Sequence, residues 1–251
     1  MSGGALPDLL ILAAGDGRRL GSAARGLPKP LVPVAGRPVI DYVADALDGV
    51  GVRFGRRAVI TNHGFVPAFR GWCGMRGFEL IDDGTTSPQT RLGGIGDMAF
   101  AIREAGLGTE GGLFVAGGDM VFTRGQGAFL QAAMRHGIVT ALHDVGSLGQ
   151  VRRFAEVDTG PDGEVRRYVE KPTDPQGTLA SIMLYWIGPG QLSIVEEYLG
   201  AGGNPDQCGR LLAWALAEGK GLHGLPVEGA WFDIGDPAAL AEAEGFLQGR
   251  P

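Results

Sequence analysis

The chain has 251 residues, of which 44% are hydrophobic and 20% are charged, and its formal net charge is −6. This length suits one large α/β domain, and the negative charge argues against a general nucleic-acid-binding surface. The 45 glycines follow no fixed period, which excludes a collagen-like or low-complexity chain. No apolar run reaches the roughly 18 residues of a membrane span, and no secretory leader is apparent, so we expect a cytoplasmic protein without a membrane partner.

The first half of the chain predicts repeated strand–helix units. Short apolar runs suit strands at Leu9–Ala13, Ala58–Thr61, Phe78–Ile81, Leu113–Ala116 and Ile138–Leu142. Stretches with helical periodicity lie between them, at Val39–Leu47, Met98–Ala105 and Ala128–Arg135. This alternation predicts a Rossmann-like, mostly parallel mixed sheet flanked by helices. Ligands bind beyond the carboxyl ends of such strands, so the turns at 14–21 and 117–120 should converge on one crevice.

The second half continues with strands and then helices. The patterns predict strands at Phe154–Val157, Val165–Glu170, Leu179–Ile187 and Gly221–Pro226. They predict helices at Leu192–Leu199, Asp206–Glu218 and Ala238–Leu247. No linker-like stretch separates the two halves, so we expect a single domain.

A glycine-rich turn directly follows the first predicted strand. The run Leu10–Leu12 leads through two alanines into Gly15-Asp16-Gly17-Arg18-Arg19, and Pro28-Lys29-Pro30 follows after a short gap. Glycines let backbone N–H groups approach phosphate oxygens, and the cations offset the charge that collects there. The pattern predicts a binding loop for a nucleoside triphosphate.

Two better-known phosphate motifs do not fit this turn. A P-loop needs a Lys-Ser or Lys-Thr pair after a glycine, and each of the three lysines is followed by another residue type. The dinucleotide-binding fingerprint needs a third glycine where the chain has Leu20, and an acidic residue about 20 positions further on. The turn with its Pro-Lys-Pro segment is therefore a different kind of phosphate site.

Two aspartates stand at the ends of predicted strands. Asp119 follows an apolar run and two glycines, and Asp233 lies in the segment Trp231–Pro237. Mg²⁺ prefers oxygen ligands and usually takes one or two carboxylates together with phosphates, so both are candidate metal ligands. Asp119 taken alone is equally compatible with a turn residue. Asp236, which precedes a proline, predicts the N-cap of the last helix.

Four ordered motifs resemble the sugar-1-phosphate nucleotidyltransferases, also called NDP-sugar pyrophosphorylases. They are the glycine-rich opening that continues through Pro28-Lys29-Pro30-Leu31 to Pro33–Ile40, then Gly118-Asp119, Glu170-Lys171-Pro172, and the segment Trp231–Leu240. The resemblance covers about residues 9–240. It implies a single domain over residues 1–251 with the nucleotide-diphospho-sugar transferase type of fold. Residues of about 8–145 would form the nucleotide-binding half and 146–251 the acceptor-binding half.

The resemblance also implies roles for individual residues. Arg19 and Lys29 would act on the triphosphate as catalytic residues, and Lys171 would bind the acceptor phosphate. Asp119 and Asp233 would hold the Mg²⁺ cofactor. The nucleotide-binding residues would be Ala13, Ala14, Gly15, Gly17, Arg18 and Gly93. The acceptor-binding residues would be Asp119, Ala155, Glu170, Lys171 and Met183.

The acceptor half departs from the family pattern. Ala155 stands where the family has glycine, and Ile182 and Met183 stand where it has a polar residue and a glycine. Such apolar bulk suits a phosphate that is smaller or less polar than glucose 1-phosphate, such as a deoxysugar, cyclitol or other alcohol phosphate. Asp97 replaces a small residue, and we expect it either to cap the helix over 98–105 or to contact the acceptor. The polar segment 82–91 is expected either to read the base or to form a surface loop.

The resemblance implies an enzyme that makes an NDP-sugar and pyrophosphate from an NTP and a sugar 1-phosphate. The acceptor phosphate would attack the α-phosphorus in line, with catalysis by positioning and charge stabilisation. Two alternatives stay open: nucleotidyl transfer, for example cytidylyl transfer, to a non-sugar alcohol, cyclitol or choline phosphate, and a non-catalytic nucleotide-binding paralogue. The base, the acceptor and the oligomeric state, with a homodimer as one option, cannot be deduced from these motifs.

Overall fold

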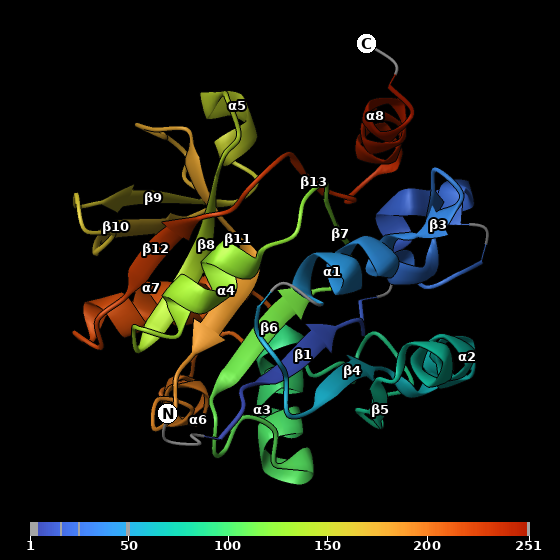
Figure 1. Ribbon diagram of the computed structural model, residues 1–251, viewed down its shortest axis with the longest axis horizontal. Coiled ribbons are helices and arrows are strands. Elements are labelled where there is room, and N and C mark those ends of the chain that lie inside the picture. The colour runs from blue at the N-terminus through green and yellow to red at the C-terminus, as the bar shows by residue number, and fades with distance from the viewer. Residues whose placement is uncertain (1–4, 16, 25, 49–50, 250–251) are drawn as a thin grey trace.

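The computed structural model describes residues 5–15, 17–24, 26–48 and 51–249, and the side chain of Arg18 lies outside this part. One sheet runs through the molecule in the order β10-β9-β11-β6-β1-β4-β5, with β8 and β12 attached beside β11 (Figure 1). Its strands are β1 (Asp8–Leu12), β4 (Arg57–Thr61), β5 (Glu79–Asp82), β6 (Leu113–Gly117), β8 (Ile138–Asp144), β9 (Ala155–Thr159), β10 (Val165–Glu170), β11 (Leu179–Ile187) and β12 (His223–Pro226).

The strand directions change within this sheet. β6, β1, β4 and β5 are parallel to one another, as expected for strands joined through helices. The long strand β11 is antiparallel to β8 along one side, and to β6 and β9 along the other. The expected mixed α/β sheet is therefore confirmed, and strands from both halves of the chain share it.

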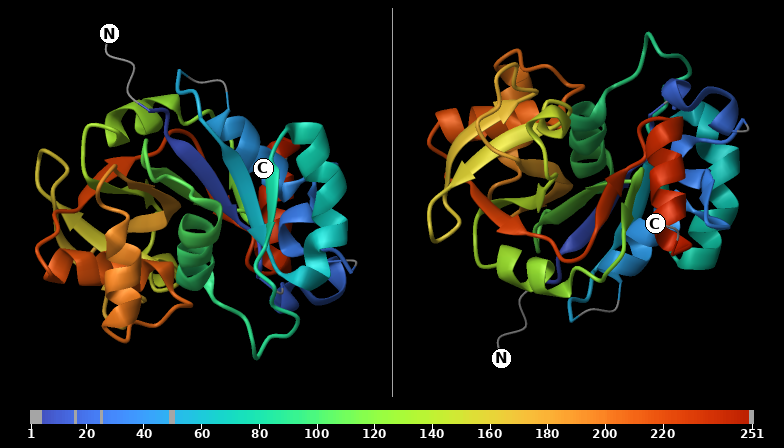
Figure 2. Two further views of the ribbon diagram at one scale, coloured as in Figure 1. Left: turned by 90° about the horizontal axis from the view of Figure 1, so that it is seen from below. Right: turned by 90° about the horizontal axis from the view of Figure 1, so that it is seen from above.

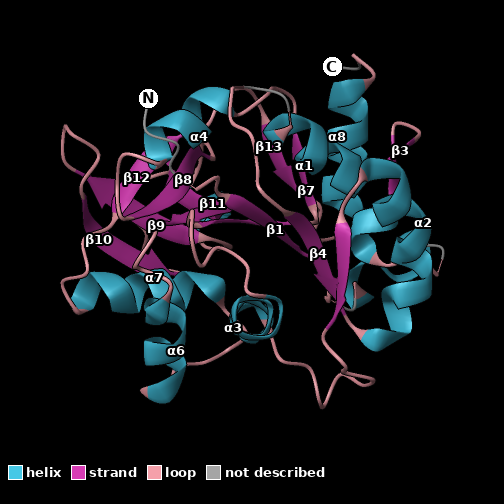
Figure 3. Ribbon diagram, turned by 60° about the horizontal axis from the view of Figure 1, so that its bottom comes forward, coloured by secondary structure: helices cyan, strands magenta, loops and turns pink. Residues whose placement is uncertain are grey.

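Helices cover both faces of the sheet (Figures 2 and 3). One face carries α1 (Val39–Leu47) and α4 (Gly127–Ala133), and the other carries α3 (Gly94–Ala105), α6 (Ser193–Gly200) and α7 (Cys208–Ala217). α2 (Val66–Arg76) packs beside β5 at the edge. The sheet is thus the middle layer of three.

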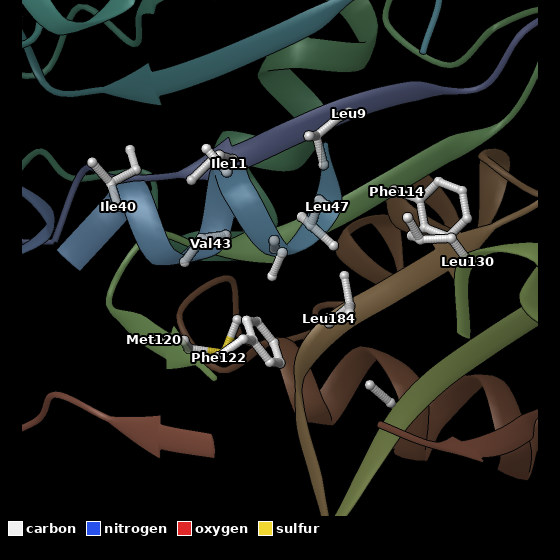
Figure 4. Packing of buried hydrophobic residues seen from close by; sticks show 14 of the residues in the cluster. Leu9, Ile11, Ile40, Val43, Leu47, Phe114, Met120, Phe122, Leu130 and Leu184 are labelled. Carbon is white, nitrogen blue, oxygen red and sulfur yellow. The ribbon is translucent and has the colours of Figure 1, made fainter. Parts of the chain in front are cut away.

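The strand β1 shows why both faces are covered. Leu9 and Ile11 point toward α1, where they join Val43 and Leu47 in one apolar cluster (Figure 4). Leu10 points the opposite way into the cluster that contains the α3 residues. Successive strand residues face opposite sides, so a strand buried on both faces is a continuous apolar run, which is the pattern that predicted β1.

Short elements surround the carboxyl ends of the parallel strands. β7 pairs with β13 in a two-stranded ribbon, and α8 packs on β13 and on η1. These elements are η1 (Arg18–Ala24), η2 (Lys29–Leu31), β2 (Pro33–Val34), β3 (Arg37–Pro38), η3 (His63–Phe65), β7 (Met120–Phe122), α5 (Leu148–Val151), β13 (Trp231–Asp233) and α8 (Pro237–Leu247).

Two predictions about helix ends had opposite outcomes. Asp236 caps α8, because its side chain accepts a hydrogen bond from the Ala239 N–H at 2.9 Å. The prediction that Asp97 could cap its helix is wrong: α3 begins at Gly94, so Asp97 lies inside its first turn. Gly94 and Gly96 belong to this first turn, although glycines weaken the helical signal in the sequence.

Candidate active site

The carboxyl ends of β1 and β6 meet at the base of the candidate site. The Gly118 N–H donates to the Leu12 carbonyl at 2.9 Å, which joins the glycine-rich turn after β1 to the turn after β6. A Cβ on Gly118 would lie 3.1 Å from that carbonyl oxygen, so a larger residue would disturb this contact. The two turns that were expected to converge therefore do so.

The β7–β13 ribbon brings the two predicted metal ligands together. Asp233 pairs in register with Met120, and the Ile234 N–H donates to the Asp119 carbonyl at 2.9 Å. Asp119 and Asp233 are 114 positions apart in the chain, yet this strand pairing places them next to each other. Their side chains are 33% and 24% exposed, so both remain accessible.

Lys29 places a positive charge beside these two carboxylates. Its Nζ lies 2.5 Å from Asp119 Oδ2 and 4.0 Å from Asp233 Oδ1, and its side chain is 10% exposed. Lys29 begins η2, and the backbone of Gly17, with φ of +61°, lies against it. The Pro-Lys-Pro segment thus places a buried positive charge against both aspartates.

The charge balance at Asp233 favours a cation. Burial and the nearby Asp119 carboxylate raise the pKa of Asp233. Lys29 and two arginines, Arg153 and Arg19, oppose this shift by attraction. A divalent cation held between the two carboxylates would act in the same direction as these three side chains.

The donor set fits Mg²⁺. Two partly exposed carboxylates from adjacent strand ends match the protein ligands that Mg²⁺ usually takes together with phosphates and water. No group of three or more His, Cys, Asp or Glu side chains suited to a metal occurs in the described part of the chain.

Arg153 belongs to this site, although the sequence motifs gave it no role. It precedes β9, and its Nη2 lies 3.9 Å from Asp233 Oδ2 and 3.3 Å from Asp236 Oδ2. Arg19 is exposed on η1 on the same side of Asp233. The arginine at 153 has no local motif around it, so its place could be found only from the fold.

A cleft of about 490 Å³ extends from Asp119 toward the β5 edge of the sheet. Five of the predicted residues line it: Ala14, Gly15, Gly93, Asp119 and Met183. The cleft has further walls that the motifs did not assign, formed by Leu12, Asn62, Phe65, Asp83, Thr85, Arg91, Asp97, Asp206 and Cys208. The size suits a small organic ligand.

Other predicted residues lie near the cleft but not in its lining. Ala13 is buried, and its N–H donates to the Ile60 carbonyl at 2.9 Å. Lys171 is exposed and has φ of +48°, a strained conformation for a lysine, and its N–H donates to the Phe154 carbonyl at 2.8 Å. The other predicted residues absent from the lining are Gly17, Arg19, Lys29, Ala155, Glu170 and Asp233.

Glu170 faces α7 in this structure. A Cβ on Gly209 would lie 2.0 Å from Glu170 Oε2, so the carboxylate occupies the space beside the start of that helix. Burial raises the pKa of Glu170, while Lys171 and Arg210 lower it. Ala155, 2% exposed, pairs with Glu170 across β9 and β10. The structure therefore joins Asp119 and Met183 in the cleft but leaves these two residues outside it.

The loop around Gly93 is held by the second half of the chain. The Ile95 N–H donates to the Pro205 carbonyl at 2.8 Å, and a Cβ on Gly93 would lie 2.6 Å from that oxygen. Arg91, from the polar segment 82–91, pairs with Asp206 at 2.5 Å. This segment therefore forms a wall of the cleft.

Comparison with known proteins places the chain in a family. The family model described as nucleotidyl transferase matches residues 9–249, and the chain belongs to this family. The resemblance drawn from the sequence motifs is thereby confirmed. Within the described residues, no helix has the length and apolar character to cross a membrane.

Individual relatives are more distant. Over 44 residues the chain is 52% identical to the CMP-5'-(3-aminopropyl)phosphonate synthase of Streptomyces rubellomurinus, which is 18% of this chain and 7% of that protein. It is 24% identical over 253 residues to the bifunctional protein GlmU of Methanococcus maripaludis, covering 96% of this chain and 54% of that protein. The chain therefore spans about half the length of that GlmU relative.

A solved structure from Bacillus anthracis, assigned as a glucose-1-phosphate thymidylyltransferase in complex with a sucrose, has a similar fold. The TM-score is 0.76 with 22% sequence identity, and the match covers 96% of this chain and 95% of that one. This similarity shows the fold.

Proposed function

We propose that the protein transfers a nucleotidyl group from an NTP to the phosphate of a sugar 1-phosphate or a related phosphate ester, and releases pyrophosphate. The observation that carries this proposal is the cluster of Lys29, Asp119 and Asp233, of which Asp119 also lines the cleft. A buried lysine between two carboxylates, beside a glycine-rich turn, can hold a triphosphate and a divalent cation together.

The reaction needs little from the protein beyond placement. An oxygen of the acceptor phosphate forms a bond to the α-phosphorus, the bond to the β-phosphate oxygen breaks, and the electron pair leaves with pyrophosphate. The attacking oxygen is already anionic, so no strong general base is required. Lys29 and Arg19 would offset the charge on the triphosphate, and Lys171 would hold the acceptor phosphate.

Asp119 and Asp233 would hold Mg²⁺ at this site. Bound Mg²⁺ supplies charge neutralisation and fixed geometry for the reacting phosphates. Because Lys29 contacts Asp119 closely, binding of the ion would require the lysine to share this carboxylate or to turn toward the phosphates.

A second candidate is transfer to a non-sugar phosphate or phosphonate. Met183 lines the cleft, whereas Ala155 and Glu170, the residues expected to meet a sugar, do not. The Streptomyces relative named for an aminopropylphosphonate product also favours a non-sugar acceptor. We retain this candidate as an alternative to the sugar 1-phosphate.

Pyrophosphate release tests the proposal. The protein is incubated with Mg²⁺, each of the five common NTPs, and a panel of sugar and alcohol phosphates. We expect release with at least one pair, which depends on Mg²⁺ and on the acceptor. Asp119→Asn and Asp233→Asn should each lower the rate by about 10²–10³.

Asp236→Asn is the matched control. Asp236 lies three residues from Asp233, and an asparagine can still cap α8, so its rate should stay within about fivefold of the wild type. Nucleotide binding without release for any pair would contradict the proposal and favour a non-catalytic nucleotide-binding protein.

A further inference from the structure

Two buried aspartates form a part of the cleft wall that the proposed reaction leaves unused. Asp97 is 4% exposed and Asp83, which follows β5, is 6% exposed, yet both line the cleft. Asp97 Oδ1 and Asp83 Oδ2 lack hydrogen-bond partners among the described residues. Asp83 Oδ1 accepts from the N–H and hydroxyl of Thr85, at 2.6 and 2.7 Å. Buried carboxylate oxygens without donors are costly, so this pair calls for an explanation.

Burial and the neighbouring carboxylate favour the protonated form of Asp97. Burial raises the pKa of Asp97 to about 8, and the charge of Asp83 and a hydrogen bond to it act in the same direction. A negative charge on Asp97 beside Asp83 is therefore disfavoured unless a positive charge compensates it. A positively charged ligand can take the place of the proton on Asp97.

The charged neighbours of Asp97 come from the loop before α7. Asp206 adds negative charge near Asp97, and its own carboxylate pairs with Arg91. Burial raises the pKa of the Cys208 thiol to about 12, with Asp97 contributing, so this thiol stays neutral. Arg91, which lines this part of the cleft, is therefore already paired with Asp206.

An apolar path connects the aspartate pair with the reacting groups. At the end of β6, a Cβ on Gly117 would lie 3.1 Å from Met183 Cγ. Leu12 is in register with Gly117. A Cβ on Gly94 would lie 3.6 Å from Leu12 Cδ1 and 2.6 Å from Cys208 Sγ, so this backbone lies close to both side chains. A ligand along this path would have a phosphate at one end, a short apolar middle and a positive charge at the other end.

We propose that Asp97, together with Asp83, binds an ammonium group of the acceptor, and that the acceptor is an aminoalkyl phosphate or phosphonate. This inference rests on the proposed function, which places the acceptor phosphate near Asp119. An ammonium group supplies both the positive charge and the N–H donors that the two unpaired oxygens lack. An uncharged amino group of a nucleobase would leave the charge of the pair uncompensated.

A matched pair of acceptors tests this inference. The protein is preincubated with Mg²⁺ and α,β-methylene analogues of the NTPs, which do not transfer the nucleotidyl group, and titrated calorimetrically with 3-aminopropyl phosphate or n-propyl phosphate. We expect the amine to bind at least about tenfold more tightly. Both acceptors carry a phosphate that can lose a proton on binding, so we expect the amine to release more protons than n-propyl phosphate between pH 6 and 8, seen as heat that depends on the buffer.

The variant Asp97→Asn should remove both the preference for the amine over n-propyl phosphate and the additional proton release. Its affinity for n-propyl phosphate and for the NTP analogue should stay at the wild-type value. Asp83→Asn, which keeps an oxygen for Thr85, serves as the second variant if the first does not fold.

Equal affinity of the wild-type protein for both acceptors, binding of neither, or a preference retained in both variants would overturn the inference. Pyrophosphate release with a sugar 1-phosphate under those outcomes would leave the proposed function intact. Silence with every acceptor in the turnover assay, combined with tight amine binding, would instead contradict the proposed reaction and keep the ammonium site.

Discussion

At the scale of single residues, the site depends on how backbone shape positions Lys29. The lysine contacts Asp119, and this contact needs η2 to lie close to the turn after β1. Gly17 allows that approach, because it has φ of +61° and a Cβ there would lie 3.2 Å from Lys29 Cβ. The glycine of the phosphate-loop motif therefore shapes the place of the cation.

Gly17→Ala should lower activity through Lys29. The added methyl group pushes on the lysine, and the left-handed backbone costs about 1 kcal/mol for a residue with a side chain. We expect pyrophosphate release to fall at least about tenfold, because Lys29 leaves its place between the carboxylates. Initial rates and thermal unfolding measured together separate the two effects.

Gly21→Ala is the control for backbone strain. Gly21 has a similar φ of +52°, but a Cβ there meets no atom within 4 Å. Its ψ of −129° lies outside the left-handed helical region, so this variant should lose at least as much stability while it keeps most of its activity. Equal losses of activity in both variants would show that strain in the loop, rather than contact with Lys29, is responsible.

Sequence patterns predicted the residues with strong local motifs. Asp119 and Asp233 follow strands within recognisable motifs, and the structure places them next to each other. Arg153 and the Asp83–Asp97 pair were not assigned this way, because their roles come from neighbours far away in the chain. Asp97 was noticed as a departure from the family pattern, but its partner could not be deduced without the fold.

At the scale of elements, buried strands were the easiest to predict. β10 and β11 have the bounds that their apolar patterns predicted. α2 was missed, since its sequence contains a proline and two glycines and shows weak helical periodicity. The ribbon of β7 and β13 was also missed, because each strand has three residues and forms only by pairing with a distant segment.

The N-cap of α8 allows a prediction about one element. Asp236→Ala removes the acceptor for the Ala239 N–H and should cost about 1 kcal/mol, which corresponds to a fall of about 2–4 °C in Tm. Asp236→Asn keeps an acceptor and should unfold within about 1 °C of the wild type. Calorimetric unfolding of both variants checks this. Equal Tm values for the two variants would mean that the ion pair with Arg153, which both variants lose, matters more than the cap.

At the scale of the whole molecule, the cleft joins the two halves of the chain. Asp83 and Asp97 come from the parallel part of the sheet and its helix, whereas Asp206 and Cys208 come from the loop and helix that cover the same face later in the chain. The buried carboxyl pair therefore lies where the halves meet. A group buried with an altered pKa at such a place affects the stability of the entire fold.

The stability of the protein should fall with rising pH because of Asp97. Its pKa is raised from 3.8 to about 8 in the folded protein, so between these values the folded state binds a proton that the unfolded chain releases. The stabilisation from this proton is complete below pH 3.8 and is lost as the pH rises to 8. Asp97→Asn does not titrate, so its Tm relative to the wild type should increase by about 8–16 °C between pH 5 and pH 8.5, equivalent to about 4 kcal/mol.

Any constant effect of the asparagine on packing cancels in this comparison, because only the change with pH is used. Glu110→Gln, at an exposed position, serves as the control for the loss of one negative charge. A Tm difference between Asp97→Asn and the wild type that does not change with pH would mean that Asp97 is ionised in the folded protein at pH 5. Its charge would then be compensated by a group other than a proton. A bound ammonium would replace the proton on Asp97. Saturating 3-aminopropyl phosphate should therefore raise the Tm of the wild type more at pH 8 than at pH 6.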